Sequence, residues 1–155
     1  MRIWRADAAE AADVARLIGE FGEWFGNDTP GEQEIRASVE RIMASDGGEY
    51  LLGSVDEGRG SAPAAVCQLR FRWSVWKSAE DCWLEDLYVR EEARRAGLGR
   101  ALVEGALERA RERGCRRIEL DVNEDNAAAR ALYEACGFLA EPKPPGRTLF
   151  IGRPL

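Results

Sequence analysis

The chain has 155 residues, with 22 Lys and Arg against 28 Asp and Glu side chains, a formal net charge of −6 and no histidine. This length suits one domain with its own core, the acidic balance argues against general nucleic-acid binding, and the lack of histidine excludes Ser-His-Asp triads and nearly all common catalytic zinc sites. The apolar runs are too short to span a membrane, and the first residues lack the apolar stretch of a signal peptide, so we expect a cytoplasmic protein with neither a nucleic-acid nor a membrane partner.

The first half of the chain predicts a strand, two helices and three strands. Asp7 and Glu10 form a capping box at the start of the first helix, and Pro30 lies in the first turn of the second. Alternation of apolar and polar side chains marks the middle strand of the three. The predicted elements are a strand at 2–6, helices with apolar stripes at 14–25 and 35–43, and strands at 49–56, 65–75 and 82–90.

The second half predicts helices and strands in alternation. Gly114 and Gly137 stand where glycine commonly ends a helix. Helix-connected strands flank a run of hairpin-like strands, so the sheet should be mixed. The overall order is β-α-α-β-β-β-α-β-α-β. The predicted elements here are a helix at 98–113, a strand at 115–122, a helix at 127–136 and a strand at 147–152, with an additional short strand at 138–141 left open.

The four cysteines are widely spaced and lie within apolar patterns. They are Cys67, Cys82, Cys115 and Cys136, and none forms a C-x-x-C pair. We therefore expect reduced thiols that pack like small apolar side chains, rather than disulfides or metal ligands. Acid–base chemistry then falls to Asp, Glu, Tyr, Cys, Lys or the chain termini.

A glycine-containing segment, Arg94-Arg95-Ala96-Gly97-Leu98-Gly99-Arg100, follows a predicted strand and opens a predicted helix. Backbone amides at the positive end of a helix dipole suit a phosphate or diphosphate. The spacing is not that of a P-loop, and Leu102 stands where the dinucleotide fingerprint needs its third glycine. From spacing alone, an anion site and a glycine-rich helix start with solvated arginines both remain open.

Two motifs resemble the GNAT superfamily of acetyl-CoA-dependent N-acetyltransferases. R-x-x-G-x-G from Arg94 to Gly99 resembles the family's coenzyme A pyrophosphate loop, and 84–89 resembles the strand beside the acetyl group. The segment 126–138 resembles the family's later helix motif. The resemblance implies an α+β fold with a central mixed, mostly antiparallel twisted sheet flanked by about four helices. It also implies a single N-acetyltransferase domain over 1–155, with acetyl-CoA as co-substrate and no metal.

The resemblance also implies roles for particular residues. The strand at 83–89 is similar to that of spermidine/spermine-type acetyltransferases, which implies that Glu85 is the base for the amine, with Asp86 or water as alternatives. Tyr133 is implied as proton donor to the departing thiolate. Without the motif, the two acids read as structural carboxylates and Tyr133 as an amphipathic helix residue. The implied cofactor-binding residues are Leu87, Tyr88, Val89, Arg94, Arg95, Ala96, Gly97, Leu98, Gly99, Arg100, Asn126 and Tyr133.

The expected acceptor is the primary amine of a small cationic molecule. A protein N-terminal or lysine acetyltransferase, a non-catalytic CoA-binding sensor and a nucleotide-binding domain are the alternatives, and a homodimer is left open. Aromatic and acidic side chains could form a pocket for a cation, although core aromatics and surface acids explain each of them more simply. These side chains are Phe21, Trp24, Phe25, Trp73, Trp76, Glu20, Glu23, Asp28 and Asp81.

Overall fold

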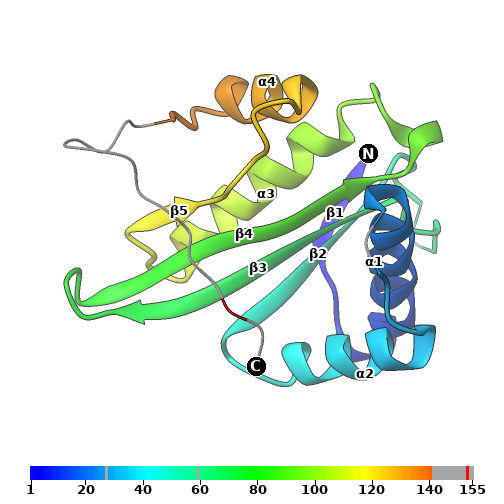
Figure 1. Cartoon of the computed structure of the whole chain (residues 1–155), viewed down its shortest axis with the longest axis horizontal. Coiled ribbons are helices and arrows are strands. Elements are labelled where there is room, and N and C mark those ends of the chain that lie inside the picture. The colour runs from blue at the N-terminus through cyan, green and yellow to red at the C-terminus, as the bar shows by residue number, and fades with distance from the viewer. Residues whose placement is uncertain (27, 59, 141–152, 154–155) are drawn as a thin grey trace.

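The computed structural model describes residues 1–26, 28–58, 60–140 and 153. Within these residues, five strands form one sheet in the order β1-β2-β3-β4-β5. Helices α1 and α2 cover one face of the sheet, and α3 and α4 lie on the other side (Figure 1). The elements are β1 Arg2–Arg5, η1 Ala8–Glu10, α1 Ala11–Phe25, α2 Glu32–Met43, β2 Gly48–Ser54, β3 Ala65–Ser74, β4 Ala79–Val89, η2 Glu91–Ala93, α3 Leu98–Glu112, β5 Arg117–Glu119 and α4 Ala127–Ala135, where η marks a 3-10 turn.

The sheet is mixed and mostly antiparallel, which confirms the expected fold class. Strands β1 to β4 pair antiparallel with their neighbours, and β5 pairs parallel with β4. The predicted order of strands and helices through α4 is also confirmed.

Two strand predictions differ from the structure. The strand predicted at 115–122 is reduced to Arg117–Glu119, because its pairing with β4 ends at Glu119 and the two strands then separate. Residues 138–140 form no strand. Residue 141 and the strand predicted at 147–152 lie outside the described residues.

The two faces of the sheet carry separate apolar cores, because successive strand side chains point to opposite sides. On the α3 face, Leu69 and Leu84 pack with Leu102. On the α1 and α2 face, Leu17 and Val66 belong to the second core. Each core therefore joins a helix layer to the middle of the sheet.

The predicted capping box is confirmed at the start of the first helical segment. The amide of Ala9 donates to the Asp7 carboxylate at 2.8 Å, and the amide of Asp7 donates to the Glu10 carboxylate at 3.0 Å. The indole of Trp4 also donates to Glu10, at 2.8 Å. The box starts η1, which runs directly into α1, and so it fixes how the chain leaves β1.

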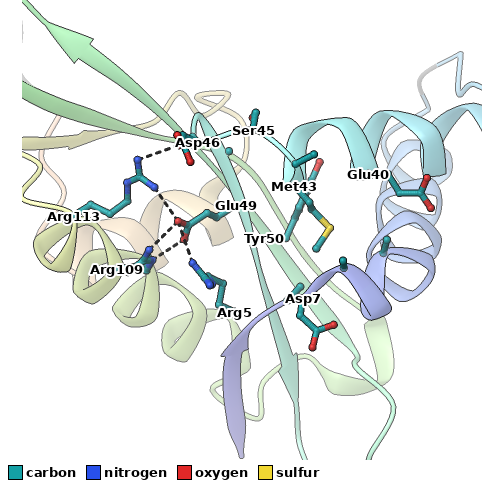
Figure 2. Close-up of a pocket in the computed structure, with 15 residues that line it drawn as sticks. Arg5, Asp7, Glu40, Met43, Ser45, Asp46, Glu49, Tyr50, Arg109 and Arg113 are labelled. Atoms are coloured by element: carbon teal, nitrogen blue, oxygen red, sulfur yellow. Dashed lines mark hydrogen bonds and ion pairs between the residues drawn. The ribbon is translucent and has the colours of Figure 1, made fainter.

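An ion-pair network joins β2 to α3 at the end of the sheet shown in Figure 2. Arg109 donates to the Glu49 carboxylate at 2.6 and 2.9 Å, and Arg113 donates to it at 3.0 Å. Arg113 also donates to Glu80 of β4 at 2.9 Å. Burial acts to raise the pKa of Glu49, but hydrogen bonds from Arg109 and Arg113, with the charges of Arg109 and Arg5, outweigh it and hold the pKa below its usual range. A cavity of about 440 Å³ borders this network.

We expect Glu49→Gln to lower the free energy of unfolding at pH 7 by about 1–3 kcal/mol, because two guanidinium groups lose a charged acceptor. The native pKa of Glu49 lies below its ordinary value of 4.5, so its contribution is complete above that value and is lost as the pH falls through the native pKa. Urea unfolding at pH 7 and at about pH 4 should therefore show a smaller difference from wild type at the lower pH.

The matched control is Glu40→Gln, which removes an exposed carboxylate whose one ion-pair partner among the described residues is Arg36 on its own helix. This variant should stay within about 0.5 kcal/mol of wild type. If the two variants lost the same free energy of unfolding at pH 7, this would contradict a special role for the Glu49 network.

Candidate active site

Strands β4 and β5 pair over only a short stretch and then diverge. Residues 81–83 of β4 align with residues 117–119 of β5, whereas β4 continues to Val89. Beyond Trp83, the edge of β4 that faces away from β3 has no strand partner among the described residues. The separation of the backbone of β4 from the segment that leads into α4, which lies alongside α3, is called the opening (Figure 1).

The pairing with β3 shows which backbone groups face this opening. The amide of Arg90 donates to the carbonyl of Ala64 at 3.0 Å. Because hydrogen-bonded and outward-facing residues alternate in an antiparallel pair, Tyr88 directs its backbone to β3. Leu87 and Val89 then direct theirs to the open edge. The side chain of Tyr88 is buried against α1, so among the three strand residues expected to bind the cofactor, this one lies away from the opening.

The glycine-containing segment forms the turn that leads into α3. Gly97 is the N-cap of α3 with φ +86°, and Arg95 has φ +64°, so two residues adopt the left-handed conformation. The first amides of α3, from Leu98 to Arg100, have no partner within the helix. A Cβ atom on Gly99 would lie 3.4 Å from Leu132 and 3.8 Å from Val89. Gly99 therefore allows the start of α3 to lie close to β4 and α4, and the free amides of this helix start suit a diphosphate.

A β-bulge places the two predicted carboxylates. Gln68 pairs with Asp86 and Leu69 pairs with Leu84, which leaves Glu85 as an extra residue in β4. The side-chain amide of Gln68 donates to Glu85 at 2.7 Å, and Arg70 lies 3.8 Å from the same carboxylate. The Glu85 side chain is 45% exposed. Glu85 is therefore held in place while still open to solvent.

Asp86 is half-buried and lies in a negative environment. Burial raises its pKa to about 6, and the charges of Glu85 and Asp121 act in the same direction. A carboxylate with a pKa this close to neutral can both take up and release a proton under physiological conditions.

Tyr133 lies in α4 and packs against the core between the sheet and α3. Burial raises its pKa to about 12, with further contributions from Cys67, Asp121 and Asp86. Its hydroxyl is therefore protonated at neutral pH. The side chain of Asn126 accepts a hydrogen bond from the amide of Ala129 at 3.1 Å, so Asn126 caps the helix that carries Tyr133.

Sequence reasoning missed Gln68 and Asp121. Gln68 reads as one of the polar residues in an alternating strand, and only the bulge places it against Glu85. Asp121 falls inside a segment predicted as strand. Because Asp121 alternates with Leu120 and Val122 as an outward polar residue of a strand would, no separate signal for it is present in the sequence.

The structure brings only part of the predicted aromatic pocket together. Phe21, Trp24 and Phe25 of α1 gather with Tyr88. Trp73 instead pairs with Glu80, eight residues before Tyr88 along β4, a distance of roughly 26 Å at about 3.3 Å per residue. The prediction of one pocket was therefore wrong, because it joined aromatics from opposite ends of a long hairpin.

Two further members of that set, Trp76 and Asp81, lie in the β3–β4 hairpin, whereas Glu20 lies on α1 one turn before Trp24. Trp76 is 96% exposed in the turn between β3 and β4. The carboxylate of Asp81 accepts hydrogen bonds from Lys77 in the same hairpin, and Glu20 binds Arg90.

The described residues show neither a metal site nor a membrane span. Across 1–26, 28–58, 60–140 and 153, no group of three or more His, Cys, Asp or Glu side chains could hold a metal ion. Within the same ranges, every helix falls short of the length and apolar character needed to cross a membrane.

Comparison with known proteins places this geometry in a family. The profile of the acetyltransferase (GNAT) family matches residues 16–138. Thialysine N-epsilon-acetyltransferase of Bos taurus is 28% identical over 144 residues, which cover 87% of this chain and 82% of the relative. Aminoglycoside N(6')-acetyltransferase type 1 of Stenotrophomonas maltophilia is 28% identical over 139 residues, covering 88% and 84%.

A solved structure agrees with these relatives. A crystal structure from Arthrobacter sp. FB24, assigned to the acetyltransferases, superposes with a TM-score of 0.83 at 33% identity, covering 100% of this chain and 96% of that one. The profile match extends from α1 through the glycine turn to the end of α4, so it contains both carboxylates of the bulge and Tyr133. The chain therefore belongs to the GNAT acetyltransferase family and is an acyltransferase by descent and by fold.

Proposed function

We propose that this enzyme transfers the acetyl group of acetyl-CoA to the primary amine of a small cationic molecule, by direct attack of the amine. The observation that carries the proposal is Asp86, a half-buried carboxylate with a pKa raised to about 6, beside the gap between β4 and β5. Two relatives are named for amine acceptors, thialysine and an aminoglycoside. Both are small molecules, which supports an acceptor of that size.

The backbone around the gap suits coenzyme A. The amides of Leu98, Gly99 and Arg100 would hold the diphosphate at the start of α3, with Arg95 and Ala96 leading into that turn. The Leu87 carbonyl and the Val89 amide, which both face outward, would pair with the amides of the pantetheine arm, as a neighbouring strand does. When bound, acetyl-CoA supplies an activated thioester carbonyl. The outward Leu87 amide would be a donor available to the carbonyl oxygen, where negative charge would develop.

Deprotonation of the amine is assigned to Asp86. An alkylamine has a pKa of about 10.4, so most of it arrives protonated. Asp86 takes up that proton at its carboxylate, directly or through one water. Glu85, which is exposed and held by Gln68, provides the negative charge that attracts the ammonium group and helps to raise the pKa of Asp86.

The proposal is tested by incubating the protein with acetyl-CoA and a panel of diamines, lysine analogues, aminoglycosides and short peptides. Release of the CoA thiol and the mass of the product identify the transfer and the acceptor together. CoA should raise the melting temperature by mass action, and ATP and NAD should raise it much less. Acetylation of peptides alone would move the acceptor to the protein class, whereas equal stabilisation by all three cofactors without transfer would refute the proposal.

The pH dependence of kcat/KM for the amine should identify the base. In wild type we expect a rise through about pH 6, where Asp86 loses its proton. Asp86→Asn should remove this rise and lower kcat/KM at pH 7 by about 10²-fold to 10⁴-fold. Raising the pH should restore part of the activity, because more of the amine is then already deprotonated.

Glu85→Gln is the matched control for Asp86→Asn. This variant should keep the rise of kcat/KM with pH but shift it to lower pH, because loss of the neighbouring negative charge makes Asp86 easier to ionise. If the rise of kcat/KM with pH were lost in Glu85→Gln but kept in Asp86→Asn, then Glu85 would be the base and Asp86 would provide the negative charge.

Tyr133 is proposed as the proton donor to the departing thiolate, because its hydroxyl stays protonated up to a pKa of about 12. Tyr133→Phe keeps the ring that packs near Phe138 but removes the hydroxyl. Fold and CoA affinity should survive, while single-turnover transfer at saturating acetyl-CoA slows by about 10²-fold to 10⁴-fold. A rate within about threefold of wild type would show that the thiolate leaves without this hydroxyl.

A further inference from the structure

We propose that the last turns of α1 hold the glycine turn in its cofactor-binding shape, with Trp24 as a positioning residue that raises the affinity for CoA. The inference rests on the proposed cofactor site at the start of α3. It concerns a helix that contributes no residue to that site.

Two pairs of side chains join α1 to the segment before the turn. Arg90 donates to the Glu20 carboxylate, from Nε at 2.7 Å and also from Nη2. The guanidinium of Arg94 lies over the ring of Trp24, with its central carbon 5.0 Å from the ring centre. Glu20 and Trp24 are one helical turn apart, and so present the same side of α1. They contact arginines that precede and follow η2, and therefore hold both ends of this short turn.

Arg94 is held at a second point as well. Its Nε donates to the carbonyl of Val89 at 2.9 Å, on the edge of β4 that faces the gap. The side chain thus connects the end of β4 to α1, with Trp24 fixing the plane of the guanidinium. Trp24 is 56% exposed, and an exposed cation–π contact of this kind contributes a modest but measurable stabilisation.

The turn needs such support because its backbone is strained. Arg95 follows Arg94 directly and has φ +64°, a conformation that residues with a side chain rarely adopt. Unfavourable backbone conformations persist where contacts with the surrounding structure hold the residue in place. Here α3 fixes the turn on one side, and Arg94 fixes it on the other. Without Trp24, Arg94 gains rotational freedom, and the amides of the turn are less often arranged for a diphosphate.

The test is a double-mutant cycle in which the Kd for CoA is measured by calorimetry for each variant. Trp24→Ala should raise the Kd about two- to fivefold, and Trp24→Phe, which keeps an aromatic face, should restore most of the affinity. In an Arg94→Ala background, Trp24→Ala should have no further effect, because its partner is already gone. Trp73→Ala is the control: its ring is 67% exposed and lies at the far end of the hairpin, so it should leave the Kd unchanged.

Steady-state kinetics separate positioning from general loss of structure. Trp24→Ala should raise the KM for acetyl-CoA while kcat at saturating acetyl-CoA stays close to wild type. An unchanged Kd in Trp24→Ala, or the same loss with and without Arg94, would overturn the positioning role while leaving the cofactor site intact. Failure of the wild-type protein itself to bind CoA would overturn the cofactor site and this inference with it.

Discussion

The early separation of β4 from β5 is the constraint on which the rest of the site depends. If the parallel pairing continued beyond Trp83, the outward backbone groups of Leu87 and Val89 would be satisfied by a strand. An open strand edge is normally a liability, because another chain can pair with it. Here the edge lies beside the turn into α3 and the chain that leads to α4, so it suits a narrow extended ligand whose phosphates end at a helix start.

The same separation explains the unusual electrostatics beside the gap. Two other acids of the sheet are matched by arginines: Glu49 of β2 binds Arg109 of α3, and Glu80 of β4 binds Arg113 at the end of that helix. Beside the gap, Asp86 is half-buried and its charge is opposed by Glu85 and Asp121. A half-buried acid whose charged form is disfavoured, at a place where the cofactor is proposed to lie, has the pattern of a functional site rather than of a structural ion pair.

Local patterns predicted the elements well, because each depends on residues close in sequence. The capping box at Asp7 and the turn at Gly97 are examples. The bulge at Glu85 could not be predicted, since the apolar pattern of 82–89 does not show where a register shift occurs. The length of β5 depends on where its partner diverges. The mistaken pocket with Trp73 had a similar cause, because composition does not reveal which end of a long hairpin a ring occupies.

Helix α1 links the two halves of the proposed reaction. Phe21 contacts Tyr88 on the face of the sheet that carries Glu85, and Glu20 and Trp24 hold the segment before the glycine turn. The contacts with Arg90 and Arg94 are about 70 residues apart in sequence, so no local motif contains both partners. A family motif such as R-x-x-G-x-G therefore identifies the amides that face a diphosphate but omits what keeps them in place. In this chain the contacts to Arg90 and Arg94 come from a helix outside the motif, so on our proposal the affinity of the turn would depend on the packed fold as well as on the loop.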